Sequence, residues 1–137
     1  MAAEGEIWTV RHGDLERSRP WAILEGDATP FDLTGWTVHA QLRATAVDDV
    51  IIYEWTRAHG VTVTTALVQL ADATEVTTAA VQLFLEPADY AVLTRAQPSW
   101  TGSFDVEIAS DATTAPVRRY TIVADAKLVI LGDITHD

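Results

Sequence analysis

One stretch decides the fold class of this chain: it reads Trp36-Thr-Val-His-Ala-Gln-Leu-Arg43. Apolar and polar side chains alternate strictly along it. The apolar phase holds Trp36, Val38, Ala40 and Leu42, and the polar phase holds Thr37, His39, Gln41 and Arg43. Because successive side chains of a strand point to opposite faces, this period of two predicts a strand with one buried face and one wet face.

A second stretch repeats the pattern nearer the C-terminus. Residues Trp100–Ile108 alternate in the same way, with polar Thr101, Ser103, Asp105 and Glu107 in the outward phase. The two strands together predict a core made from their inward phases. We therefore expect a hydrophobic core that includes Trp36, Val38, Leu42, Phe104, Val106 and Ile108.

Shorter apolar and β-branched runs, separated by turn signals, predict further strands. These are Glu6–Arg11, Pro20–Leu24, Ile51–Thr56, Val61–Leu70, Val76–Leu85, Val117–Val123 and Lys127–Leu131. Pro87–Arg95 is the one helical turn expected, because proline suits the first helical position and Tyr90 with Leu93 forms an i,i+3 apolar pair. The chain is therefore predicted to be all-β, an antiparallel β-sandwich of about seven to nine short strands with one short helical turn.

The run Val61–Leu70 departs from regular alternation. Its apolar residues lie at odd positions in the first half and at even positions, Val68 and Leu70, in the second half. A shift of phase within one strand predicts a bulge or a break, which we place near Thr65-Ala66.

Size and charge limit the possible partners. The 137 residues, of which 48% are hydrophobic, predict one folded domain over residues 1–137 with short flexible termini. Nine basic and twenty acidic residues give a net charge of −11, and the basic residues are scattered. Because nucleic acids and anionic membranes attract concentrated basic faces, we expect neither as a partner.

The N-terminal sequence bears on where the protein is made. Met1–Glu6 has neither the basic start nor the apolar stretch of a signal peptide. No apolar run approaches the roughly 20 residues that span a bilayer. We expect a soluble protein made in a cytoplasm without a signal peptide, and the lack of cysteine leaves the redox compartment open.

No constellation of residues predicts catalysis. The histidines at positions 12, 39, 59 and 136 show no metal-ligand spacing, and no nucleophile elbow, phosphate loop or dinucleotide fingerprint occurs. Asp48-Asp49 fits a solvated turn, and the pair Asp105 and Glu107 fits the wet face of a strand. We expect no enzyme activity, no catalytic or metal-binding residues and no cofactor.

The five tryptophans are a heavy load for a chain of this size. Trp36 and Trp100 open alternating strands and are expected in the core, whereas Trp8, Trp21 and Trp55 have three possible roles. They can be core residues, anchors of a protein interface, in which tryptophan is enriched, or platforms for a sugar. As candidate protein-docking residues we select Ile7, Trp8, Trp21 and Trp55.

The chain termini are candidate docking arms. Met1–Trp8 and Gly132–Asp137 each adjoin a predicted strand that can lie at a sheet edge, and a partner chain can complete such an edge. Ile7 and Trp8 favour docking for the N-terminal arm, because apolar side chains are unfavourable in water.

Several segments, in order, resemble a known family. They are Arg11-His-Gly-Asp14, Trp21–Leu24, Phe31-Asp-Leu-Thr-Gly-Trp-Thr-Val-His-Ala-Gln-Leu-Arg43, Val81–Leu85, Pro87–Leu93, Ser103–Ile108 and Gly132–Thr135. Together they are similar to small immunoglobulin-like phage virion domains, which resemble the N-terminal domain of phage baseplate upper proteins. The chain departs from the pattern where His12 separates Arg11 from Gly13, and where Leu67–Ala80 is longer than usual.

The resemblance implies an immunoglobulin-like β-sandwich that serves as a non-enzymatic phage virion structural protein. The leading expectation is a tail-tip or baseplate component that links the tail to receptor-binding or fibre proteins. The alternatives are a capsid decoration protein on the head surface and a carbohydrate-binding module for host surface glycans. Its expected partners are other virion proteins, in multiple symmetric copies. The resemblance also implies that the protein is made in a bacterial host cytoplasm and is located in the virion.

Overall fold

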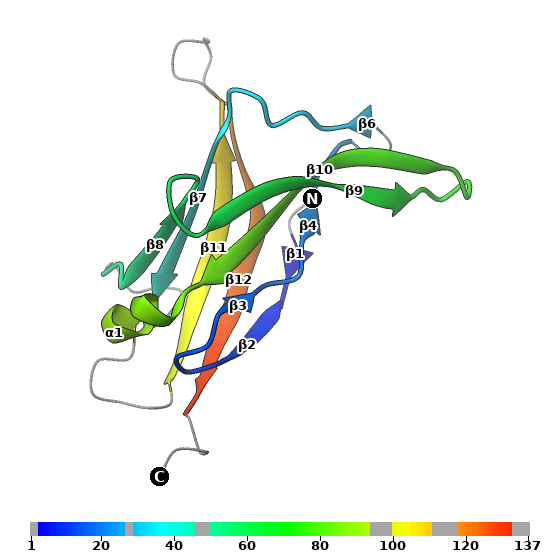
Figure 1. Ribbon diagram of the computed structural model, residues 1–137. Helices are drawn as coiled ribbons and strands as arrows, with labels where there is room; N and C mark the ends of the chain where they lie inside the picture. Colours follow the sequence, from blue (N-terminus) through cyan, green and yellow to red (C-terminus); the bar gives the residue numbers. More distant parts are fainter. Residues whose placement is uncertain (1–2, 27–28, 46–49, 94–99, 111–117, 133–137) are drawn as a thin grey trace.

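The computed structural model describes residues 3–26, 29–45, 50–93, 100–110 and 118–132. These residues form two β-sheets packed face to face, and one long β-hairpin projects beyond the packed region (Figure 1). The predicted all-β sandwich is confirmed.

The larger sheet has six strands. They are β1 (Ala3–Glu4), β2 (Ile7–Arg11), β7 (Thr37–Arg43), β8 (Tyr53–Thr56), β11 (Trp100–Ala109) and β12 (Arg119–Leu131). The order is β1-β12-β11-β7-β8. β2 also pairs with β12, at residues 127–131, which follow the residues that pair with β1. Both β1 and β2 run parallel to β12, whereas the other neighbours are antiparallel.

The second sheet is centred on one long strand. Its members are β3 (Glu16–Arg17), β4 (Trp21–Ala22), β9 (Val61–Gln69) and β10 (Glu75–Leu85). β10 pairs with β3 and β4 along one edge and with β9 along the other. A separate pair, β5 (Leu24–Glu25) and β6 (Thr29–Pro30), follows β4.

This strand order is that of an immunoglobulin-like sandwich. The sheet β12-β11-β7-β8 corresponds to strands G, F, C and C′ of that fold, and β4-β10-β9 corresponds to B, E and D. Seven strands of the described chain have four or more residues, and the other five have two each.

Most of the predicted elements are present, but the structure divides some of them differently. The helical turn is present as a 3₁₀ turn over Pro87–Asp89 and a helix α1 over Tyr90–Leu93, and residues 94–95 lie outside the described part. The two strands predicted at Val117–Val123 and Lys127–Leu131 form the single strand β12. Its register against β11 shifts between Phe104 and Val106, and Asp125 (φ 52°) lies in the left-handed region there.

The predicted bulge at Thr65-Ala66 is wrong. β9 pairs with β10 in unbroken register from Val61 to Gln69. The apolar phase shifts for another reason: the first half of β9 faces the opposite sheet, whereas the second half extends past the sandwich.

The core contains the predicted residues in their alternating phase. Val38, Leu42, Phe104, Val106 and Ile108 are buried, and Trp36 is half-buried against the core. The burial patterns of β7 and β11 alternate as their sequences predict. No helix of the described residues is long and apolar enough to cross a membrane.

Candidate protein-docking surface

Three of the four predicted docking residues lie in the interior. Trp8, Trp21 and Trp55 are 7%, 4% and 0% exposed, and each ring packs near Phe104. A buried indole offers no surface to a partner of the folded domain, so the core role holds for all three. Ile7 alone among the four is exposed, at 69%.

Two of these indoles also have a polar partner. Trp55 donates from Nε1 to the carbonyl oxygen of Phe84 at 3.2 Å, and Trp21 donates to the Glu6 carboxylate at 3.0 Å. Hydrogen bonds from Arg19 and Trp21 lower the pKa of Glu6 below its ordinary value. These hydrogen bonds satisfy the indole N–H groups of Trp21 and Trp55, which would otherwise be unfavourable in the interior.

The N-terminal segment belongs to the sheet. Ala3 and Glu4 pair with β12, and the next strand sets Ile7 beside Lys127 and Trp8 beside Leu128. The predicted arm Met1–Trp8 is therefore paired with β12 at Ala3–Glu4 and again from Ile7 onward. Met1–Ala2 and residues 133–137 of the predicted C-terminal arm lie outside the described residues, as do the loops at 46–49 and 111–117.

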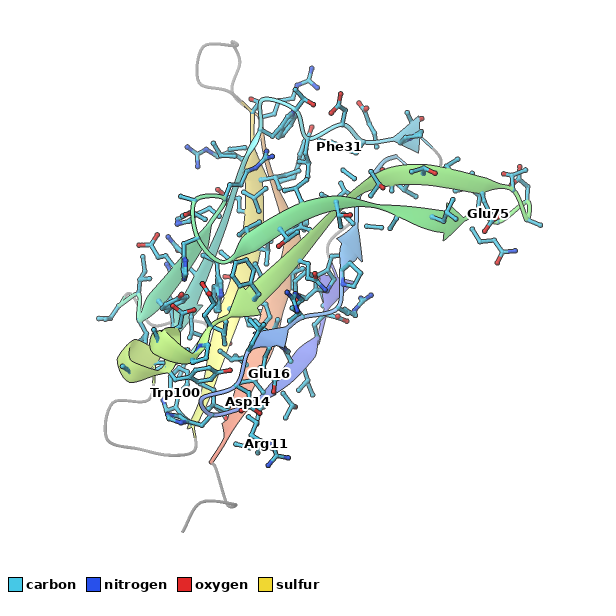
Figure 2. All side chains as sticks on the ribbon, viewed as in Figure 1. Arg11, Asp14, Glu16, Phe31, Glu75 and Trp100 are labelled. Carbon is cyan, nitrogen blue, oxygen red and sulfur yellow. The ribbon has the colours of Figure 1, made fainter. Side chains whose placement is uncertain are left out.

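The most prominent surface feature is the outer half of the β9–β10 hairpin, residues 65–77, which we name the hairpin arm. It extends past the opposite sheet, and Figure 2 shows Glu75 near its outer end. The arm includes most of the stretch Leu67–Ala80.

Apolar side chains lie on both faces of the arm. Along β9, Val61, Val63, Thr65 and Leu67 share the face that covers the core. Val61 is buried, whereas Leu67 is 68% exposed because no opposite sheet reaches it. On the other face, Val68 pairs with Val76, and both are half-buried.

The tip of the arm has a defined turn. Leu70 donates to the carbonyl oxygen of Thr74, Ala73 donates to that of Leu70, and Ala73 is left-handed (φ 71°). The Asp72 carboxylate accepts from the main-chain N–H of Thr74 at 3.1 Å and from its hydroxyl at 2.6 Å. These hydrogen bonds close the turn, and they lower the pKa of Asp72 because they favour its carboxylate form.

The base of the arm is fixed to the sandwich by Thr78. Its buried hydroxyl donates to the carbonyl oxygen of Ile23 and accepts from the N–H of Phe31 at 2.8 Å. Ala79 also donates to the Phe31 carbonyl at 3.2 Å and accepts from Ile23 at 2.9 Å. The arm therefore leaves the domain in a fixed direction.

A second surface is an aromatic groove near that base. Phe31 packs edge-on against Trp36, and Trp36 stacks on Tyr120 with 5.8 Å between ring centroids. Tyr120 is 47% exposed. Phe31 and Tyr120, with Ile23 and Ile122, line a groove of about 620 Å³ between β4–β5 and β12.

The outer face of the large sheet is polar, as the sequence predicts. Glu107 pairs with Arg119 at 3.2 Å, and Asp105 accepts from the N–H of Asp125 at 3.0 Å. His39 contacts Glu54. Both predicted outward carboxylates thus have local partners, and no group of three or more metal-binding side chains occurs among the residues that the structure describes.

In comparisons of the sequence with known proteins, no family profile and no curated protein matches the chain.

The sequence reasoning missed both the arm and the groove. One signal for the arm was available: Val61–Ala71 carries no charge in a strongly acidic chain. No comparable signal marks the groove, because Phe31 and Tyr120 are 89 positions apart in sequence and meet the same groove only in the folded domain.

Proposed function

We propose that this protein is a non-enzymatic structural protein of a phage virion, a tail-tip or baseplate component that docks to other virion proteins. The observation that carries the docking role is the hairpin arm. The virion assignment comes from the resemblance of the sequence to small immunoglobulin-like virion domains.

The arm is built for contact with a partner. A two-stranded ribbon is only marginally stable by itself in water, and this one leaves Leu67 exposed. Its base is nevertheless held by the hydrogen bonds of Thr78, and its tip is closed by the turn at Asp72. A preorganised projection with an exposed apolar side chain supports docking, because little conformational entropy is lost when such an element binds.

The residues that carry the resemblance have structural roles here. Gly13 (φ 91°) lies in the turn from β2 to β3, and Asp14 donates to the Arg11 carbonyl across it. The Asp32 carboxylate accepts from the N–H and hydroxyl of Thr34, and Gly35 (φ 82°) completes the turn into β7. Both turns need their glycine, because positive φ is unfavourable for other residues.

One alternative role has a specific observation in its favour. The aromatic groove exposes the Tyr120 ring, and exposed aromatic rings stack on sugars, so the groove supports the carbohydrate-binding alternative. Titration with host-wall glycans tests this alternative through tryptophan fluorescence, to which Trp36, stacked on Tyr120, contributes. A shift that Tyr120→Ala abolishes would favour glycan binding, and a flat titration of the folded protein would exclude it.

Immunogold electron microscopy tests the virion role. Particles are collected from lysed cultures of the bacterium that carries the gene, and an antibody against the purified domain is applied. Label at the tail tip is expected; label over the head would favour the capsid decoration alternative. Particles without label, from lysates that contain the protein, would overturn the proposal.

An incorporation assay tests the arm itself. Leu67→Glu places a charge on the arm, and Leu15→Glu makes the same change at another exposed leucine, in the β2–β3 turn. Particles should lack the Leu67→Glu protein and contain the Leu15→Glu protein. Equal incorporation of both variants would remove the docking role from the arm.

A further inference from the structure

We propose that two copies of this protein associate through the outer edges of their β9 strands, antiparallel and centred on Thr65. The two β9–β10 sheets then become one continuous sheet. This inference rests on the proposed function in one respect, since it names a second copy as a partner of the arm.

The outer edge of β9 has main-chain groups available for pairing. β10 occupies one side of β9, and no other strand of the described chain pairs with it. At the two ends of the hairpin, Phe84 donates to Gly60 and Leu70 donates to Thr74. Hydrogen-bonded pairs alternate along an antiparallel ladder, so the N–H and C=O groups of the even-numbered residues of β9 point toward β10. The N–H and C=O groups of the odd-numbered residues point away from β10, to the outer edge. The outward set is Val61, Val63, Thr65, Leu67 and Gln69.

This edge lacks the features that protect other edges. Val61–Gln69 has no charged residue, proline or glycine, and its register is regular over nine residues. By contrast, β8 has only four residues and includes Glu54, and Pro20 separates the short strands β3 and β4. Long, regular, uncharged edges are templates for another strand, so proteins usually avoid them where no partner binds.

The edge is also complementary to itself. With Thr65 opposite the Thr65 of a second copy, Val63 lies opposite the second copy's Leu67, and Val61 lies opposite the second copy's Gln69. These side chains share one face, so Leu67, which is 68% exposed, gains an apolar neighbour in each copy. The centre becomes a threonine–threonine pair, which is favourable between strands.

Charge limits where a second copy can bind. Each chain carries −11, so two copies repel over most of their surfaces. Pairing along β9 brings no acidic side chains into direct opposition. It also brings the arm tip, with Asp72 and Glu75, toward the base of the other copy's β9. Arg57 is exposed there and donates to the carbonyl oxygens of Leu33 and Trp36, and His59 is exposed beside Asp89 and Glu86.

Sedimentation velocity on the intact protein tests the association. At about 1 to 300 micromolar protein in about 0.15 M salt, a concentration-dependent dimer is expected, and it should strengthen with salt as the net repulsion is screened. Leu67→Lys should weaken association at least tenfold while circular dichroism and melting stay unchanged. Leu15→Lys is the matched control and should associate like the wild type.

A disulfide tests the register, because the natural chain has no cysteine. Thr65→Cys lies on the two-fold axis, where paired Cα atoms are close enough for a bond, and mild oxidation should give a covalent dimer. Thr62→Cys lies off the axis and should remain monomeric.

The possible outcomes separate this inference from the proposed function. A protein that stays monomeric at every concentration, or a dimer unaffected by Leu67→Lys, would overturn the association, even if the protein is present in particles. A dimer that cross-links at Thr65 supports the association, and label-free particles would then overturn only the virion role.

Discussion

Phe104 packs against aromatic side chains of both sheets. It lies on the central strand β11, and its ring centroid is 6.2 Å from those of Trp8 and Trp21 and 5.9 Å from that of Trp55. Trp21 belongs to the second sheet, whereas Trp8 and Trp55 belong to the first. Replacing Phe104 with alanine therefore removes a contact between the sheets as well as three aromatic neighbours.

The size of the effect follows from this environment. Truncation of a buried phenylalanine lowers the free energy of unfolding by about 3–5 kcal/mol, depending on how far the site collapses. Three large indole rings cannot easily move to fill the cavity that the missing phenyl ring leaves. Each lost aromatic contact adds up to about 0.5–1.5 kcal/mol to the decrease in the free energy of unfolding. We expect about 4–5 kcal/mol, a large share of the roughly 5–15 kcal/mol typical of a domain.

Urea unfolding followed by tryptophan fluorescence measures this loss. With a slope of about 2 kcal/mol per molar, Phe104→Ala should lower the midpoint by about 2 M. Phe104→Leu keeps most of the apolar volume and should lose only about 1–2 kcal/mol. A loss below about 2 kcal/mol for the alanine variant, at unchanged slope, would refute the central position of Phe104.

Three further predictions concern single positions. Gly60→Ala places a Cβ 2.5 Å from Cδ1 of the buried Trp55, at a residue with φ 96°, and should lower the free energy of unfolding by about 2–4 kcal/mol. Gly35→Ala is the control, since open space surrounds that position, and it should lower the free energy of unfolding by only about 1 kcal/mol. Equal melting temperatures of the two variants would contradict this prediction. Thr78→Val keeps the side-chain shape but leaves the N–H of Phe31 and the carbonyl oxygen of Ile23 without their hydrogen bonds to the hydroxyl. Chemical denaturation should show that the free energy of unfolding falls by about 1–3 kcal/mol. Wild-type stability of this variant would show that other contacts hold the base of the arm. Hydrogen bonds from Arg19 and Trp21 lower the pKa of Glu6, so the ionised carboxylate stabilises the fold at pH values above 4.5, the ordinary pKa of this group. This contribution disappears as the pH falls through the lowered pKa. Glu6→Gln should therefore be less stable by at most about 1 kcal/mol at neutral pH and equal to the wild type in strong acid, and a difference that persists in acid would assign the effect to packing.

Local alternation was sufficient to predict the strands and the inward side of each. Thr37–Arg43 and Trp100–Ala109 are strands with the expected phase, because a period of two is a property of a few consecutive residues and needs no knowledge of the partner strand. The helical turn after Pro87 was predictable for the same reason, since its proline and apolar pair act within one turn.

Positions near the ends of strands were less predictable. Trp36 has the right phase but is only half-buried, because it precedes β7 at the end of the sandwich, where Tyr120 covers one face of its ring. Phase shows which side of a strand is apolar, whereas the extent of burial depends on how far the opposite sheet reaches.

The arm shows the same limit more clearly. The sequence Val61–Leu70 determined by itself that its two halves differ, and we interpreted that difference as a bulge. Only the tertiary structure decided that the strand is regular and that its second half extends past the sandwich. Likewise, the composition determined that five tryptophans need an environment that suits them, but the burial of Trp8, Trp21 and Trp55 required the pairing of β2 with β12 and of β4 with β10. Those pairings join residues far apart in the chain, and no local pattern encodes which distant strand will cover a given face.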